Sequence, residues 1–181
     1  MAVPDKKEID QMLVRAWDTN KRGYPLEAIE IYNKVLELDP NYAKVYSWRA
    51  TAYIGLKDYE QAIKDCNTTI EFYPTYSEVY NNRGLAYLEL GNYTQAAADF
   101  SKAIERKKDN RIAYINRAAA YISLGDYENA IDDCNKALEL PLSAENKALA
   151  YNNRSVAYEA LGETTKAQAD FVKAKQLGYK D

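Results

Sequence analysis

The sequence predicts an all-α protein built from repeated antiparallel helix hairpins. Three segments that share the pattern Ala-Tyr-x-x-Leu-x-x-Tyr begin at Ala52, Ala86 and Ala120, so the chain repeats every 34 residues. Within each repeat the apolar residues recur at spacings of three and four, which is typical of amphipathic helices. No segment alternates between polar and apolar residues over the length of a strand. A period of this length with two helices per repeat indicates a stacked repeat architecture.

Two more copies extend the array to five repeats. One copy, with Thr164 in place of the last tyrosine, begins at Ala157 after a three-residue insertion, and a degenerate copy around 26–29 precedes the others. Gly91 fits a helix end inside a repeat, and Pro40 fits a turn between two repeats. We expect a lead-in over residues 1–8 and a single array over 9–181. Its repeats span 9–42, 43–76, 77–110, 111–144 and 148–181, and repeat position 1 is the first residue of each range.

The composition argues against catalysis and against nucleic-acid or membrane partners. The 181 residues carry a net charge of −3 with a pI of about 5.2, and no apolar run approaches the roughly 20 residues that span a bilayer. The chain lacks histidine, which is the commonest general base and metal ligand. We find no glycine-rich phosphate loop and no pairing of a nucleophile with a base. We therefore expect no enzyme, no metal site and no cofactor. Two cysteines and no visible secretory signal favour a cytoplasmic location.

Residues at fixed repeat positions resemble the tetratricopeptide repeat. Small residues stand at positions 8 and 20 of every repeat, and tyrosine stands at position 11 of every repeat except the first. The resemblance covers nearly the whole chain and implies a right-handed α-solenoid of stacked antiparallel hairpins. A lone hairpin cannot bury its apolar face, whereas stacked neighbours can. The small residues are Ala16, Ala50, Gly84, Ala118 and Ser155 at position 8, and Ala28, Ala62, Ala96, Ala130 and Ala167 at position 20.

Three further residue types find a structural explanation in this repeat frame. Cys66 and Cys134 share position 24 with phenylalanines of other repeats, so we expect them in the core. Arginine stands at position 7 of every repeat and aspartate at position 23 of the last four, which favours an internal ion pair over an anion-binding stripe. The basic cluster Arg106-Lys107-Lys108 falls in a turn, where solvation is the simpler interpretation and docking of an acidic partner is the alternative.

The first helices carry the candidate binding surface. The resemblance implies that positions 2, 5, 6, 9, 12 and 13 line a concave groove. Asparagine recurs at position 6, and a row of amides suits a peptide backbone because each amide both donates and accepts hydrogen bonds. Exposed apolar residues in such a groove indicate an interaction site. The alternative is that the asparagines are merely solvated and the apolar residues pack on neighbouring helices. The candidate groove residues are Trp17, Lys44, Trp48, Asn82, Leu85, Ile112, Ile115, Asn116, Asn153 and Val156.

The sequence therefore predicts a scaffold or adaptor that binds a peptide segment of a protein partner in the groove. The groove lacks most of the carboxylate clamp of chaperone-binding repeats, because only Lys44 matches it. The alternative is a self-assembly module, or the repeat domain of a larger protein, that stacks end to end. That alternative rests on the last helix, which ends near Leu177-Gly178 with no following helix to cover it. A homo-oligomer through this uncovered helix is thus a second expected partnership.

Overall fold

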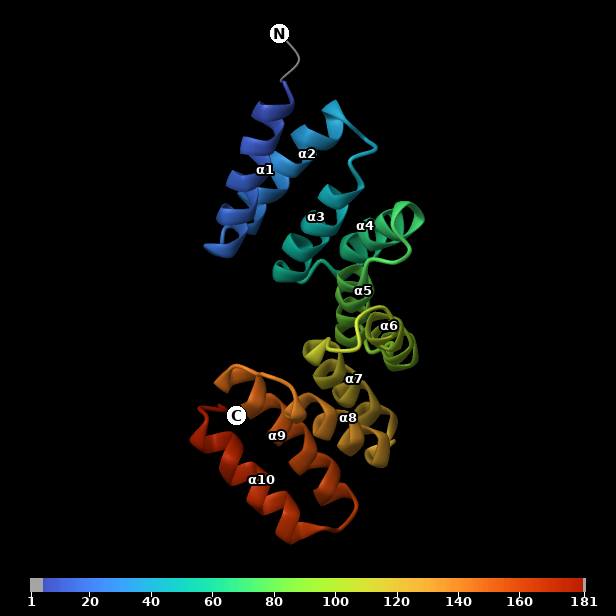
Figure 1. Ribbon diagram of the computed structural model, residues 1–181, viewed down its shortest axis with the longest axis vertical. Helices are drawn as coiled ribbons and strands as arrows, with labels where there is room; N and C mark the ends of the chain where they lie inside the picture. Colours follow the sequence, from blue (N-terminus) through green and yellow to red (C-terminus); the bar gives the residue numbers. More distant parts are fainter. Residues whose placement is uncertain (1–4, 181) are drawn as a thin grey trace. The chain divides into compact units, whose positions relative to one another are not determined.

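A computed structural model describes residues 5–180, and within them the chain forms ten α-helices and no strand. The all-α fold class is confirmed. The chain divides into two compact halves, Met1–Leu90 and Gly91–Asp181, and the division falls in the third repeat. The N-terminal half contains α1 (Lys6–Lys21), α2 (Pro25–Leu38), α3 (Ala43–Gly55), α4 (Tyr59–Phe72) and α5 (Ser77–Glu89) (Figure 1). The C-terminal half contains α6 (Tyr93–Arg106), α7 (Arg111–Leu124), α8 (Tyr127–Glu139), α9 (Ala144–Ala160) and α10 (Thr164–Gln176).

Side-chain caps and left-handed residues set the helix ends. Asp5 and Glu8 form a capping box at the start of α1, with bonds of 2.8 and 2.9 Å. Repeat position 15 follows the first helix of each repeat and always has a positive φ, which favours glycine there. Four repeats place glycine at this position, whereas Lys57 adopts a φ of 62° in the second repeat. Glycine at this position of the sequence therefore marks the hairpin turn, because the left-handed backbone conformation of the turn favours it.

The core of each half combines many buried alanines with a few large side chains, such as Tyr32 in the N-terminal half and Phe100 in the C-terminal half. In the N-terminal half, one cluster joins Leu13 of α1 and Tyr32 of α2 to Val45 of α3. Cys66 and Cys134 are fully buried, which confirms their place in the core. Burial raises the pKa of the Cys134 thiol to about 12, so this side chain stays protonated and inert near neutral pH.

Two helix boundaries differ from the repeat ranges. Helix α1 begins at Lys6, inside the stretch expected as a lead-in. Helix α9 begins at Ala144 and has 17 residues, so the three inserted residues before the fifth repeat, 145–147, extend this helix at its N-terminal end. Ser143 caps the extension through the backbone N–H of Asn146 at 3.3 Å. Within residues 5–180, no helix has the length and apolar character needed to cross a membrane.

Candidate functional site

The arginines at repeat position 7 are part of the internal structure. Arg49 of α3 donates from Nε and Nη2 to the two carboxylate oxygens of Asp65 on α4, at 2.8 and 2.7 Å. Arg117 makes the same bidentate contact with Asp133, at 2.7 Å for both bonds. The predicted ion pair between the two helices of a repeat is confirmed in the second, fourth and fifth repeats. The fifth-repeat pair is Arg154 with Asp170, at 2.6 and 2.9 Å.

Each paired guanidinium also contacts two tyrosine rings and the preceding repeat. The Cζ atom of Arg49 lies 5.3 Å from the ring centroid of Tyr46 and 5.9 Å from that of Tyr53. Its Nη1 donates to Oδ1 of Asn33, at repeat position 25 of the first repeat, at 2.6 Å. We call this set of ion pair, two rings and cross-repeat bond the arginine lock. The equivalent cross-repeat bonds join Arg83 to Asn67, Arg117 to Ser101, and Arg154 to Asn135.

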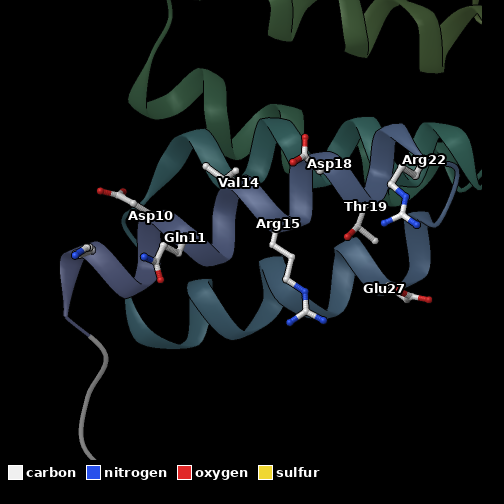
Figure 2. Close-up of a pocket in the computed structure, with 9 residues that line it drawn as sticks. Asp10, Gln11, Val14, Arg15, Asp18, Thr19, Arg22 and Glu27 are labelled. Atoms are coloured by element: carbon white, nitrogen blue, oxygen red, sulfur yellow. The ribbon is translucent and has the colours of Figure 1, made fainter.

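The first repeat lacks the arginine lock. Arg15 occupies position 7, but Met12, Thr19 and Ile31 replace the two tyrosines and the aspartate. Arg15 is exposed and lines a shallow polar surface on the outer side of α1, together with Val14 and seven polar residues (Figure 2). The paired arginines Arg49, Arg117 and Arg154 thus have their guanidinium groups engaged inside the protein, whereas the first repeat presents an exposed arginine.

An apolar cleft lies on the first helices of the N-terminal half. Its volume is about 470 Å³, and α1 and α3 supply most of its walls. The ring centroids of Trp17 and Trp48 are 6.5 Å apart at 58°, and Tyr32 supports Trp48 from the core, also at 6.5 Å. Trp17 is 40% exposed and Val14 is 63% exposed, so water reaches this apolar wall. We call this feature the tryptophan cleft, and its lining residues are Asp10, Leu13, Val14, Trp17, Tyr42 and Trp48.

The structure thus brings two of the ten candidate groove residues, Trp17 and Trp48, into one cleft. Asp10, Leu13 and Val14 also come from positions that the resemblance assigns to the groove. The sequence interpretation missed Tyr42, at position 34. This ring directly precedes α3, and its position at the junction of two repeats was the available signal.

Two asparagines at position 6 link successive first helices. Asn82 of α5 donates from Nδ2 to Oγ1 of Thr51 on α3, at 3.1 Å. Asn153 of α9 donates from Nδ2 to the backbone carbonyl of Ile115 on α7, at 3.2 Å. Each bond fixes the orientation of its amide, and neither Oδ1 accepts a hydrogen bond within the described residues. The amides therefore join neighbouring repeats and still present an acceptor.

The remaining candidate residues differ in exposure. Lys44 is exposed, Leu85, Ile112 and Asn116 are half-buried, and Val156 is 41% exposed. Ile115 is 4% exposed and packs with Ala137 and Ala150 in the core. Position 5 of this repeat points toward the neighbouring repeat, so the expectation that Ile115 offers an exposed contact is wrong. Within residues 5–180, no group of three or more carboxylates and thiols could hold a metal ion.

The hairpins, the small buried residues at fixed positions and the arginine lock define a helical repeat protein. Tetratricopeptide repeat sequence profiles match residues 31–64, 81–147 and 148–177. The chain therefore belongs to the tetratricopeptide repeat family, whose fold serves as a protein-interaction scaffold.

Solved structures show the same fold. A crystal structure of MamA aligns with a TM-score of 0.77 and 24% identity, covering 88% of this chain and 92% of that chain. MamA 41-end from Desulfovibrio magneticus RS-1 aligns with a TM-score of 0.82 and 19% identity, covering 97% of each chain. At these identities the likeness concerns the fold alone. No curated protein sequence matches this chain.

Proposed function

We propose that this scaffold is an adaptor that holds a peptide segment of a partner protein against its first helices. The tryptophan cleft is the observation that carries the proposal. Monomeric proteins expose few contiguous apolar surfaces, and tryptophan is enriched among the residues that dominate binding energy. In this cleft two tryptophans and a tyrosine surround a volume of about 470 Å³ that is open to water.

The lining of the cleft defines the chemistry of its occupant. Five of the six lining residues are apolar or aromatic, so a bulky apolar side chain of the partner fits between them. Asp10 is the one charged residue in the lining, and it favours a lysine or arginine next to that apolar side chain. Burying one large apolar side chain contributes about 1.5–3 kcal/mol, which alone supports only weak binding. A specific complex therefore needs further contacts along the first helices.

The position-6 asparagines and their neighbours supply such contacts in each half. In the N-terminal half, Oδ1 of Asn82 is available to a peptide N–H, with Lys44 and Leu85 on the same set of first helices. In the C-terminal half, Oδ1 of Asn153 is available in the same way, and Val156 offers an exposed apolar contact. Ile112 and Asn116 are half-buried and complete the proposed surface of that half.

Peptide selection with tryptophan fluorescence tests this proposal. A phage-displayed peptide library is selected on the intact protein, and the enriched peptides are titrated while tryptophan emission is recorded. Both tryptophans of the chain line the cleft, so the emission reports on this site. We expect enriched peptides with a bulky apolar residue beside a basic one. Trp17→Ala should weaken their binding by at least about tenfold, because the main apolar wall is lost.

Reversing the charge of Asp10 tests whether this residue selects the charge of the bound peptide. Asp10→Lys should shift the enriched sequences from basic to acidic neighbours of the apolar residue. The matched control is Asp132→Lys on α8, which reverses an exposed aspartate in the other half. Peptides that bind wild type and Trp17→Ala equally, without changing the emission, would contradict the proposed site. Selection that yields no peptide would contradict the adaptor function itself.

A further inference from the structure

Successive repeats contact each other through a fixed set of positions. In the N-terminal half, Ile29 and Leu36, at positions 21 and 28, share a core cluster with Val45 and Ala52 of the next repeat. In the C-terminal half, Cys134 clusters with Ala157, and Ala137 with Ala150. The first helix of a repeat thus buries positions 3 and 10 against the second helix of the repeat before it.

These contact positions are apolar at every junction between repeats. Positions 3 and 10 of the second to fifth repeats are fully buried valine or alanine. They are Val45 and Ala52, Val79 and Ala86, Ala113 and Ala120, and Ala150 and Ala157. Positions 21 and 28 of the first four repeats are likewise apolar, as Ile29 and Leu36, Ile63 and Ile70, Ala97 and Ile104, and Ile131 and Leu138.

The first repeat carries polar residues at the positions that would meet a preceding repeat. Gln11 and Asp18 occupy positions 3 and 10 of α1, and both are exposed. Figure 2 shows them on the outer side of α1, in the same surface as Arg15. Burial of this glutamine and this carboxylate against an apolar helix would cost free energy without supplying partners for them.

The fifth repeat carries the complementary change at the positions that would meet a following repeat. Gln168 and Lys175 replace the apolar residues of positions 21 and 28 on α10. Position 25 is Val172, which is 42% exposed, where the other four repeats have asparagine or serine. An incoming arginine at position 7, such as Arg15 of another copy, would find no acceptor for the cross-repeat bond of the arginine lock.

We infer that the outer faces of α1 and α10 are capping surfaces, and that copies of this chain do not stack head to tail through them. Head-to-tail contact in the register of the internal junctions would place Gln168 against Asp18 and Lys175 against Gln11, and leave Arg15 facing Val172. Gln168 and Lys175 on the last helix count against the end-to-end stacking that its lack of a covering helix suggested from the sequence. This inference is independent of the proposed peptide site.

The inference is tested by giving the two outer faces the residue types found at the internal junctions. One variant changes α1 through Gln11→Val and Asp18→Ala. A second variant changes α10 through Gln168→Ile, Val172→Asn and Lys175→Leu. Light scattering after size exclusion gives the mass of each variant alone and of an equimolar mixture over a range of concentrations. We expect wild type and each variant alone to remain single chains, and the mixture to form a complex of twice that mass.

The control is a variant with Lys64→Leu and Gln95→Ile, which makes the same types of change at exposed positions outside the junctions. It should remain a single chain in every mixture. The helical fold of each variant is checked by circular dichroism. A chain that carries all five substitutions provides a second test, and we expect it to polymerise. A mixture and a five-substitution chain that both stay monomeric while folded would overturn the inference. So would wild-type oligomers in which α1 of one copy cross-links to α10 of another.

Discussion

The first and second repeats hold their helix pairs together by different means. In the second repeat, Arg49 joins α3 to Asp65 of α4, and the ion pair lies between two tyrosine rings. In the first repeat, α1 and α2 pack through apolar residues, with Ile31 at the position of the aspartate and Tyr32 fully buried in the core cluster. The same hairpin geometry therefore tolerates either a polar or an apolar interior.

This difference shows which contacts the arginine lock adds to a repeat. The lock joins the two helices of a repeat and also reaches back to position 25 of the repeat before it, as Arg49 does to Asn33. At the first repeat the lock is absent, the outer side of α1 is polar, and the surface near Trp17 becomes an open apolar cleft. The lock is thus a feature of junctions between repeats, whereas the small residues at positions 8 and 20 are common to every repeat.

The largest expected effect comes from breaking one lock. Asp65→Ala leaves the guanidinium of Arg49 inside the structure without its carboxylate, which typically costs about 3–5 kcal/mol. Urea unfolding followed by circular dichroism should show a clear fall in the midpoint. Asp132→Ala, at the exposed position next to the fourth-repeat lock, should leave the midpoint nearly unchanged.

The double variant Arg49→Met with Asp65→Leu sharpens the comparison. It gives the second repeat an apolar interior of the kind found in the first, and we expect it to recover most of the lost stability. Burial opposes ionisation of Asp65 and raises its pKa, while Arg49 opposes that shift, so the pair offers little net free energy over an apolar replacement. A double variant as unstable as Asp65→Ala would show that the lock stabilises the repeat beyond simple charge compensation.

A smaller effect, of opposite sign, is expected at Tyr32. Its hydroxyl is the one buried side-chain polar atom without a hydrogen-bond partner in the described part of the chain. The third and fifth repeats place phenylalanine at the same position 24, as Phe100 and Phe171. Tyr32→Phe removes an unsatisfied polar group, so unfolding should require about 1 kcal/mol more.

The alkaline limb of the stability profile checks the same substitution. Burial raises the pKa of Tyr32 from 10.0 to about 12, so the folded state resists ionisation of this phenol while the unfolded chain ionises near pH 10. The contribution of the un-ionised Tyr32 phenol to the free energy of unfolding is fully present below pH 10 and is lost as the pH rises toward 12. The stability advantage of Tyr32→Phe should therefore widen over this range. If the difference in the free energy of unfolding between the two proteins stayed constant over this range, the phenol would have to be in contact with water.

The sequence predicts the fold well because the fold depends on period and residue size. The 34-residue spacing locates the first four hairpins and the repeated motif locates the fifth, while the pairing of Arg117 with Asp133 follows from their shared register. The candidate site is less predictable, because exposure depends on how neighbouring helices pack. Ile115 and Trp17 both occupy groove positions, yet contact with Ala150 buries the first while the second remains open. The cross-repeat bond of Asn82 to Thr51 likewise depends on a distance between helices that spacing alone does not give.

The smallest expected effect concerns the turn that ends the first helix of each repeat. Gly23 of the first repeat and Lys57 of the second both occupy position 15, with φ values of 87° and 62°. A left-handed conformation costs an L-residue about 1 kcal/mol, although glycine loses part of that advantage through its greater freedom in the unfolded chain. Lys57→Gly should therefore stabilise the protein by up to about 1 kcal/mol, measured by urea unfolding.

The reverse substitution, Gly23→Lys, tests the same turn in the first repeat. A Cβ atom at Gly23 would meet no atom within 4 Å, so Gly23→Lys should lower the free energy of unfolding by a similar amount through backbone strain alone. Equal and opposite shifts would show that the two repeats share one turn geometry despite their different interiors. A neutral Lys57→Gly would mean that contacts of the lysine side chain offset the strain.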